Sequence, residues 1–350
     1  MDKKTIAVLF GGCSSEYEIS LQSAYAVLTH IDPSKYYIIP VGISKTGEWF
    51  VYYGAYEKIP EDSWRKDKER LIPAMLSPDR RVRGIIEFYG ERCHHIAVDA
   101  VFPVLHGKNG EDGTVQGLCE LAGIPVIGCN SLSSALCMDK YRAHKLVQAE
   151  GVAVPESILI TRGMTAEAVE NIIAQLQFPM FIKPVRAGSS FGISKISSAA
   201  ELPEALENAF FYDYEAIAEE TIDGFEIGCA IIGSDNLTAG RVDEIELKDG
   251  FFDFTEKYTL KTSEIHMPAR INAETEERIR EIAKKIYRIL GCSVFARVDL
   301  FLAKDGRILF NEINTIPGFT DHSRFPNMLK GIGMSFDEIV EAIVRCGLEN

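Results

Sequence analysis

One segment near the C-terminal end constrains the fold more than any other stretch of the chain. Residues 297–318, RVDLFLAKDGRILFNEINTIPG, contain two apolar runs separated by an Asp-Gly pair, which is a strong signal for a β-hairpin. A two-residue turn or a four-residue loop would place Asp299 opposite Glu312 and Arg297 opposite Asn314, whereas a three-residue loop would break this register. Since residues that face each other across antiparallel strands share one side of the sheet, the segment predicts four polar side chains on one face.

These four side chains indicate a binding site for a cation, because neighbouring carboxylates are costly to desolvate without a neutralising partner. Carboxylate and amide oxygens suit Mg²⁺, which usually takes one or two carboxylates together with phosphate oxygens of a substrate. The alternative is a solvated sheet face whose ion pairs contribute little to stability. The hairpin by itself leaves both interpretations open.

The composition is that of a globular protein with more than one domain. At 350 residues the chain exceeds one ordinary hydrophobic core, so two or three domains are expected. A formal net charge of −14 argues against nonspecific binding to nucleic acid, although a local basic pocket can still hold an anion. No apolar run reaches the ~18 residues of a membrane span. The cysteines are scattered singly without a CxxC pair, and the N-terminus has the pattern of a strand and turn rather than a signal peptide. Both observations predict reduced thiols in a cytosolic protein.

The order of apolar runs predicts an α/β protein with a parallel sheet at its N-terminus. A continuous apolar run at 5–10 precedes two glycines and a helical pattern at 19–30, which is typical of the first strand and helix of such a sheet. An irregular polar and aromatic stretch at 243–268 is typical of a loop that covers an active site. We expect three domains with the boundaries 1–130, 131–215 and 216–350.

Four more positions indicate a site for an anionic substrate, but each has a structural alternative. Lys183 lies on a predicted strand before the Gly- and Ser-rich turn 187–192, whose backbone N–H groups can bind phosphate, although such segments are more often only turns. Lys140 would otherwise be an exposed helix lysine. His106 follows a strand end, where α/β sheets place ligands, and Glu16 follows the first strand. A structural histidine and a partner of the helix dipole are the alternatives for these two.

Taken together, seven motifs in order along the chain resemble the D-alanine–D-alanine ligases of the ATP-grasp superfamily. The resemblance covers nearly the whole length and implies an ATP-grasp fold preceded by an open parallel α/β domain of Rossmann-like type. The motifs are LFGG with the residues up to Ser20 (9–20), HGKNGEDGTVQG (106–117), MDK (138–140), IKPVRAGSSFGISK (182–195), EKY (256–258), RVD (297–299) and NEINTIPGFTDHSRFP (311–326).

The resemblance implies an ATP-dependent reaction in two steps. The carboxylate of D-alanine takes the γ-phosphoryl group of ATP, and the amine of a second D-amino acid then displaces phosphate and leaves a dipeptide. Arg297 and the backbone N–H of Gly318 would stabilise the oxyanion of the second step. The residues expected to bind the nucleotide are Lys140, Lys183, Ser190, Glu219, Ile222, Glu226 and Lys257. The residues expected to bind two Mg²⁺ ions, or Mn²⁺ in their place, are Asp299, Glu312 and Asn314.

The resemblance also implies contacts with the amino-acid substrates. Glu16 would hold the ammonium group of D-alanine and would close the site in a hydrogen-bonded network with Ser189 and Tyr258. His106 would lie near the first substrate, and Ser323 would contact the carboxylate of the second. The resemblance further implies that the protein is a cytoplasmic homodimer, and we expect no nucleic-acid or membrane partner.

One position departs from the plain family pattern and bears on the second substrate. Arg324 stands where D-alanine–D-alanine ligases usually carry Leu or Met, and a guanidinium buried beside a methyl group would lack a partner that the hydroxyl of D-serine supplies. The departure resembles the D-alanine–D-serine ligases of vancomycin-resistance systems, with Phe252 near the same subsite. Tyr258 favours an amine acceptor over D-lactate. A D-alanine–D-alanine ligase, another ATP-grasp ligase and an ATP-binding regulator without catalysis are the alternatives.

Overall fold

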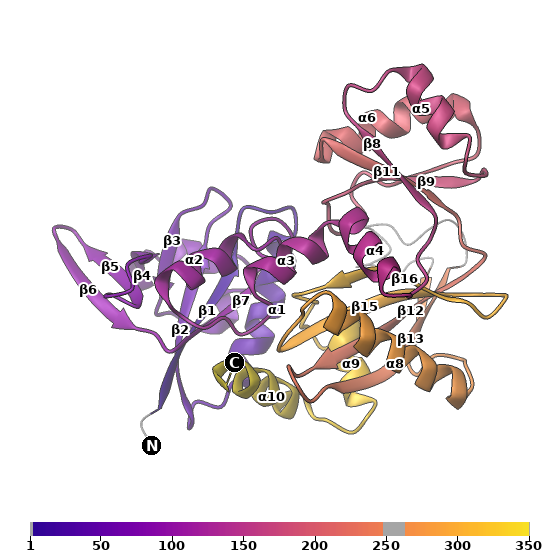
Figure 1. The fold of residues 1–350 in the computed structure, drawn as a ribbon. Helices are drawn as coiled ribbons and strands as arrows, with labels where there is room; N and C mark the ends of the chain where they lie inside the picture. Colours follow the sequence, from indigo (N-terminus) through magenta and orange to yellow (C-terminus); the bar gives the residue numbers. More distant parts are fainter. Residues whose placement is uncertain (1–2, 248–262, 350) are drawn as a thin grey trace.

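The computed structural model describes residues 3–247 and 263–349, which form three β-sheets and the helices packed on them (Figure 1). The first sheet has the strand order β6-β5-β4-β3-β2-β1-β7. Its strands are β1 (Lys4–Gly11), β2 (Tyr36–Ile43), β3 (Trp49–Tyr52), β4 (Leu71–Leu76), β5 (Gly84–Tyr89), β6 (Arg92–Ala97) and β7 (Ala100–Val104). The apolar run in β1 is buried and pairs in parallel with β2 and β7, which confirms the α/β prediction. β3 to β6 extend this core by antiparallel pairing, a feature that the sequence analysis did not indicate.

Helices from both ends of the chain cover the first sheet. α1 (Tyr17–His30) and α10 (Phe336–Glu349) share one hydrophobic core with β1 and β7, and α2 (Thr114–Ala122) packs in a second core with the same sheet. Short 3₁₀ helices lie between β3 and β4, at Tyr56–Lys58, Ser63–Lys66 and Lys68–Arg70. No helix in the described ranges is both long and apolar enough to cross a bilayer.

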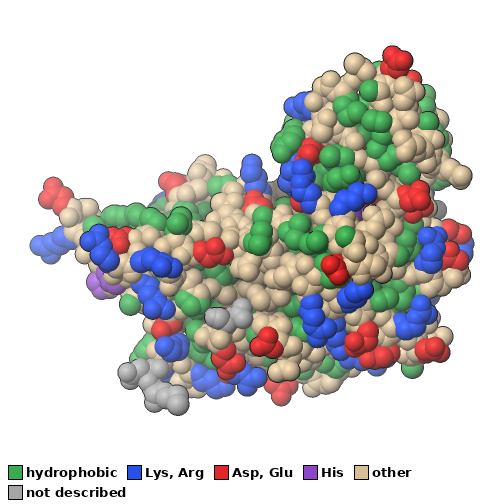
Figure 2. Space-filling model, in the orientation of Figure 1, with side chains coloured by type: hydrophobic (Ala, Val, Ile, Leu, Met, Phe, Trp, Pro, Cys, Tyr) green, Lys and Arg blue, Asp and Glu red, His purple; other side chains and the backbone are tan. Residues whose placement is uncertain are grey.

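The second sheet forms a separate lobe with its own core, which we call the upper lobe (residues 157–220). It contains β8 (Ser157–Thr161), β9 (Met180–Pro184), β10 (Ser194–Ile196), β11 (Glu215–Glu220), α5 (Ala166–Ile173), α6 (Leu202–Tyr212) and a 3₁₀ turn at Ala199–Glu201. The lobe stands above the rest of the molecule in Figure 1, and Figure 2 shows Lys and Arg side chains where the two parts meet.

The third sheet has the strand order β14-β13-β12-β15-β16. Its elements are β12 (Gly224–Ile232), β13 (Thr238–Leu247), β14 (Ser263–His266), β15 (Phe295–Ala303), β16 (Ile308–Asn314), α8 (Ala273–Ile289) and α9 (Arg324–Lys330). Two helices from earlier in the chain, α3 (Ser131–Met138) and α4 (Lys140–Ala149), also pack into the core of this sheet. Packing therefore separates these helices from the upper lobe, with which the expected boundary at residue 131 had grouped them.

The hairpin of β15 and β16 keeps the predicted pairs by an unexpected route. Its loop comprises the three residues 304–306, with Gly306 at a φ of 86°, so the expected two- or four-residue connection is wrong. β16 contains one extra residue, Asn311, and this bulge shifts the register back by one. Both predicted cross-strand pairs are present, Arg297 with Asn314 and Asp299 with Glu312.

Candidate functional site

The larger of two neighbouring cavities lies between the upper lobe and the third sheet. Its volume is about 490 Å³, and strands of both sheets form its walls. Ten predicted site residues line it: Lys140, Lys183, Ser190, Glu219, Ile222, Glu226, Arg297, Asp299, Glu312 and Arg324. The fold therefore brings the predicted nucleotide residues and the predicted metal carboxylates to one cavity.

Lys183 and Glu219 face each other in this cavity from the neighbouring strands β9 and β11. Nζ of Lys183 lies 2.5 Å from Oε1 of Glu219, and both side chains are buried. Removing one partner of such a pair leaves an uncompensated charge in a place shielded from water. Glu219 therefore determines where the ammonium group of Lys183 stands.

Lys140 reaches the same cavity from the first turn of α4. Asp139 caps this helix by accepting the N–H of Arg142 at 2.9 Å. Nζ of Lys140 donates to the carbonyl of Ala187 at 2.8 Å and lies 3.3 Å from the carboxylate of Glu312. Lys140 therefore connects the start of the Gly- and Ser-rich turn to the hairpin.

The polar face of the hairpin is internally paired. Arg297 donates from Nε and Nη2 to the two oxygens of Asp299 at 2.8 and 2.6 Å, and Nδ2 of Asn314 donates to Asp299 at 2.8 Å. The oxyanion residue expected from the sequence thus forms a buried salt bridge in this arrangement. Oδ2 of Asp299 accepts two of these bonds and Oδ1 accepts one, so one lone pair of Oδ1, which Nη1 of Arg324 approaches at 3.4 Å, is left for a cation. Together with Glu312, Asp299 forms an oxygen-rich donor set that fits Mg²⁺.

Arg324 lies where the two cavities meet and is surrounded by acidic side chains. Its Nε and Nη2 donate to Asp243 at 2.7 and 2.8 Å, and its Nη1 lies 3.0 Å from Glu226 and 3.4 Å from Asp299. Burial alone would lower the pKa of Arg324, but the three carboxylates raise it well above its ordinary value. The expectation that this guanidinium lacks a partner without a substrate hydroxyl is therefore wrong.

Asp243 and Gly228 are site residues that sequence reasoning missed. Gly228 on β12 pairs with Asp243 on β13 and with Asp299 on β15, so it leaves a gap between two carboxylates. The guanidinium of Arg324 fills this gap, because a Cβ at Gly228 would stand 2.4 Å from its Nη2. A glycine inside a strand pattern often marks a place where another group approaches the backbone closely. Gly228 was therefore the signal in the sequence that could have indicated this contact.

The smaller cavity, of about 190 Å³, lies beside the larger one, between the first sheet and the loop that follows β16. Arg297 and Arg324 line both cavities, which therefore share a wall. The predicted substrate and catalytic residues in its lining are Glu16, His106, Arg297, Gly318, Ser323 and Arg324, and Asn314 lines it as well. Three predicted residues lie outside the described part of the chain: Phe252, Lys257 and Tyr258.

Glu16 and Ser189 connect the first sheet to the upper lobe. Oγ of Ser189 donates to the carboxylate of Glu16, and both side chains are buried. A Cβ at Gly107 or Gly188 would stand 2.5 or 3.0 Å from that carboxylate, so the two glycines make room for it. Ser189 and Ser190 have φ values of 51° and 58°, a conformation that costs roughly 1–3 kcal/mol per residue outside glycine. The turn is therefore held in a shape that its sequence does not favour.

Both ring nitrogens of His106 are hydrogen-bonded to protein groups. Nδ1 lies 2.9 Å from the carbonyl oxygen of Ile316, to which it must donate. Nε2 lies 2.9 Å from Oγ of Ser23, which itself accepts the N–H of Phe319 at 3.2 Å. Two hydrogen bonds therefore fix the orientation of the ring. His106 holds the loop that carries Gly318, in addition to lining the cavity.

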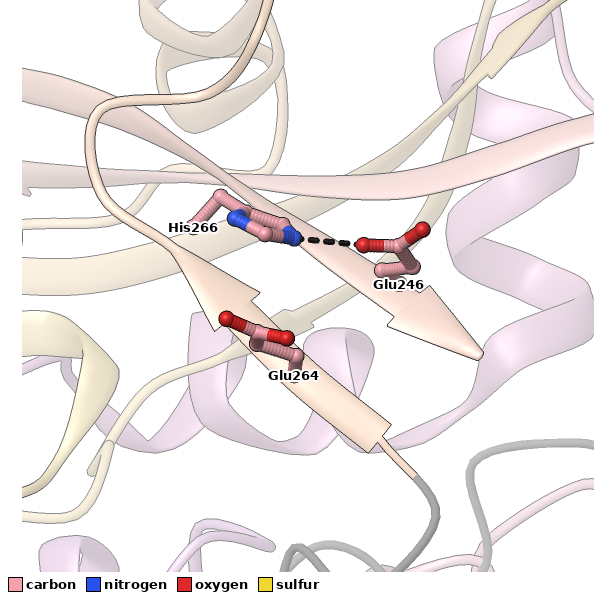
Figure 3. Close-up of side chains that lie close together, drawn as sticks. All are labelled: Glu246, Glu264 and His266. Carbon is pink, nitrogen blue, oxygen red and sulfur yellow. Dashed lines mark hydrogen bonds and ion pairs between the residues drawn. The ribbon is translucent and has the colours of Figure 1, made fainter. Parts of the chain in front are cut away.

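A further cluster lies on the strands that flank residues 248–262, where Glu246, Glu264 and His266 come close together (Figure 3). Nε2 of His266 lies 2.7 Å from Glu246, and Nη1 of Arg270 lies 2.9 Å from the same oxygen. Two basic groups thus already share Glu246, and Glu264 is exposed. We interpret the cluster as a surface ion-pair group rather than a metal site.

Comparison with known proteins matches both halves of the chain to models of one family. Residues 5–129 match "D-ala D-ala ligase N-terminus" and residues 146–345 match "D-ala D-ala ligase C-terminus". The chain is 42% identical to the vancomycin B-type resistance protein VanB of Enterococcus faecalis, with 100% of both chains covered. It is 39% identical to a D-alanine–D-alanine ligase of Caldicellulosiruptor bescii, with 100% of this chain and 96% of that protein covered. The crystal structure of the VanG D-Ala:D-Ser ligase from Enterococcus faecalis matches with a TM-score of 0.93 and 58% identity, covering 99% of this chain and 100% of that one.

Proposed function

The chain belongs to the D-alanine–D-alanine ligase family of ATP-dependent ligases, and we propose that it joins D-alanine to D-serine. The observation that carries this proposal is the position of Arg324, whose guanidinium lines both cavities. The similarity to a solved D-Ala:D-Ser ligase at 58% identity supports the same acceptor. The dipeptide would enter modified peptidoglycan precursors and confer resistance to vancomycin.

In the first step the protein would hold D-alanine in the smaller cavity and ATP in the larger one. Glu16 offers its carboxylate to the ammonium group of D-alanine, and Ser189 orients that carboxylate. Lys140 and Lys183 present ammonium groups to the phosphates and offset charge as the γ-phosphoryl group moves to the D-alanine carboxylate. Mg²⁺, when bound, adds Lewis-acid stabilisation of the same phosphoryl oxygens. The residues that would hold two such ions are Asp299, Glu312 and Asn314.

In the second step the acceptor amine attacks the acyl carbon and phosphate leaves. Arg297 and Gly318 line the smaller cavity, where the oxyanion would form, and each donor of this kind is typically worth roughly 3–4 kcal/mol. A guanidinium has five N–H groups, and two of those on Arg297 bond Asp299. The remaining N–H groups have no acceptor among the described residues, so the salt bridge is compatible with this role.

Arg324 would select D-serine by a hydrogen bond that D-alanine cannot form. Three of its five N–H groups bond Asp243 and Glu226, and Asp299 can take a fourth. Among the described residues, at least one N–H group is therefore left for a substrate hydroxyl. A hydrogen bond to a charged group is worth roughly 1.5–3 kcal/mol, which corresponds to a preference on the order of ten- to a hundredfold.

Other features of the proposal rest on the family resemblance. They are the adenine and ribose contacts of Glu219, Ile222 and Glu226, the contact of Ser323 with the acceptor carboxylate, the roles of Phe252, Lys257 and Tyr258, substitution of Mn²⁺ for Mg²⁺, a homodimer and a cytoplasmic location. Each is a proposal that awaits its own test.

The proposal is tested by measuring ADP formation with D-alanine alone, with D-serine alone and with both, and by identifying the dipeptides by mass. We expect ADP and D-alanyl-D-serine from the mixture, and the loss of both products when Mg²⁺ is chelated. A mixture that yields only D-alanyl-D-alanine would favour a D-alanine–D-alanine ligase. ATP binding without ADP formation under any condition would favour a regulator.

A further inference from the structure

Charged side chains connect the upper lobe to the third sheet behind the larger cavity. Within the described residues the two sheets share no β-ladder. Asp139 and Arg142 belong to α4 and its cap, which pack with the third sheet, whereas Arg186 and Glu215 belong to the upper lobe. The carboxylates of Asp139 and Glu215 are each only 6% exposed. The acids of this junction are therefore shielded from water, whereas the side chains of Arg186 and Arg142 are 27% and 50% exposed.

Two arginines bridge the junction. Nη1 of Arg142 lies 2.6 Å from Asp139 on its own helix and 3.0 Å from Glu215 across the junction. Arg186 lies 2.7 Å from Asp213 and 2.9 Å from Glu215 within its lobe, and 3.4 Å from Asp139 across the junction. Hydrogen bonds from Arg142 hold the pKa of Glu215 below its ordinary value, so this carboxylate is charged at neutral pH. Both arginines thus contact acids on both sides.

The network is continuous with the groups that face the cavity. The backbone N–H of Lys140 donates to the carbonyl of Val185 at 3.2 Å, and its Nζ donates to the carbonyl of Ala187 at 2.8 Å. Arg186 lies between these two acceptors in the sequence, and the turn that carries Ser189 begins with the second of them, Ala187. A change in the position of Arg186 would therefore alter the positions of both Lys140 and the turn.

We propose that Arg186 is a positioning residue that keeps the upper lobe closed while the acyl phosphate is present. This inference rests on the proposed function, since it requires that intermediate. If the lobe opens, water can cleave the acyl phosphate to D-alanine and inorganic phosphate, and the net reaction becomes ATP and water to ADP and phosphate. Closure of the lobe therefore couples ATP consumption to dipeptide formation.

The test compares phosphate released with dipeptide formed in the full chain and in its Arg186→Gln variant. Arg162→Gln is the matched control, because Arg162 lies in the same lobe over the ring of Phe210, outside the network. We expect equal amounts of phosphate and dipeptide from the unmodified chain and the control. In Arg186→Gln the ratio of phosphate to dipeptide and the KM for ATP should each rise roughly fivefold or more, and Arg186→Lys should restore part of the coupling.

A second variant keeps the inference testable if Arg186→Gln fails to fold. Arg142→Gln removes the bonds to Glu215 from the other side of the junction and should uncouple the reaction in the same way. A folded Arg186→Gln or Arg142→Gln variant that keeps phosphate and dipeptide equal would overturn the inference. Failure of the unmodified chain to form any dipeptide would instead refute the proposed function, so the two failures are distinguishable.

Discussion

At the scale of single residues, the acceptor subsite depends on a buried arginine whose charge is balanced by neighbouring carboxylates. Arg324 was recognisable in the sequence because it replaces an aliphatic residue, but its partners Asp243 and Glu226 lie far from it along the chain. Replacing Arg324 alone would remove the buried guanidinium that pairs with Asp243, at a cost of about 3–5 kcal/mol. A loss of D-serine preference in such a variant could therefore reflect lost stability, and a gentler change is needed.

Gly228→Ala offers that gentler change. The added methyl would stand 2.4 Å from Nη2 of Arg324 and 2.8 Å from both Oδ1 of Asp243 and Cε of Met328, so it should displace the guanidinium from Asp243 while every charge remains. We expect the ratio of kcat/KM for D-serine to that for D-alanine to fall by about tenfold, the effect of losing roughly 1.4 kcal/mol. Gly117→Ala on α2 is the control, since its Cβ would have no atom within 4 Å. An unchanged ratio in Gly228→Ala would remove Arg324 from the account of selectivity.

At the scale of elements, the hairpin shows what a sequence pattern can and cannot predict. The assumed turn placed Asp299 opposite Glu312 and Arg297 opposite Asn314, and both pairs are present because the bulge in β16 offsets the one-residue difference in loop length. The sequence pattern did not predict the three-residue loop or the bulge at Asn311, because several loop lengths suit an Asp-Gly pair. A contact from another element holds the bulge, since Nε2 of His144 on α4 donates to the carbonyl of Asn311 at 2.6 Å.

The burial of His144 predicts a pH dependence of stability. Burial lowers the pKa of His144, so the folded protein keeps the ring neutral, whereas the unfolded chain takes up a proton below its ordinary value of 6.5. The unfolded state then binds more protons, and the free energy of unfolding should fall as pH drops from about 7.5 to about 5.5. Urea unfolding should show a smaller decrease for His144→Gln than for the unmodified chain. An equal decrease in both would show that groups other than His144 cause the effect. His95→Gln, at an exposed position, serves as the control.

At the scale of the whole molecule, the two cavities exist because distant segments pack together. Sequence motifs indicated the order of the parts, and of the predicted site residues in the described part of the chain all but Ser189 line one of the two cavities. The motifs did not indicate that α3 and α4 join the core of the third sheet, or that α10 joins the first. Such choices depend on which apolar faces meet in three dimensions, and a local pattern of hydrophobicity does not encode this. The result places Arg324 in a wall shared by both cavities.

The most direct test of the account is a competition between acceptors in the intact enzyme. With ATP, Mg²⁺ and equal concentrations of D-alanine and D-serine, the amounts of the two dipeptides report the ratio of kcat/KM for the two acceptors. The account predicts that D-alanyl-D-serine exceeds D-alanyl-D-alanine on the order of ten- to a hundredfold. Equal amounts, or an excess of D-alanyl-D-alanine, would contradict it.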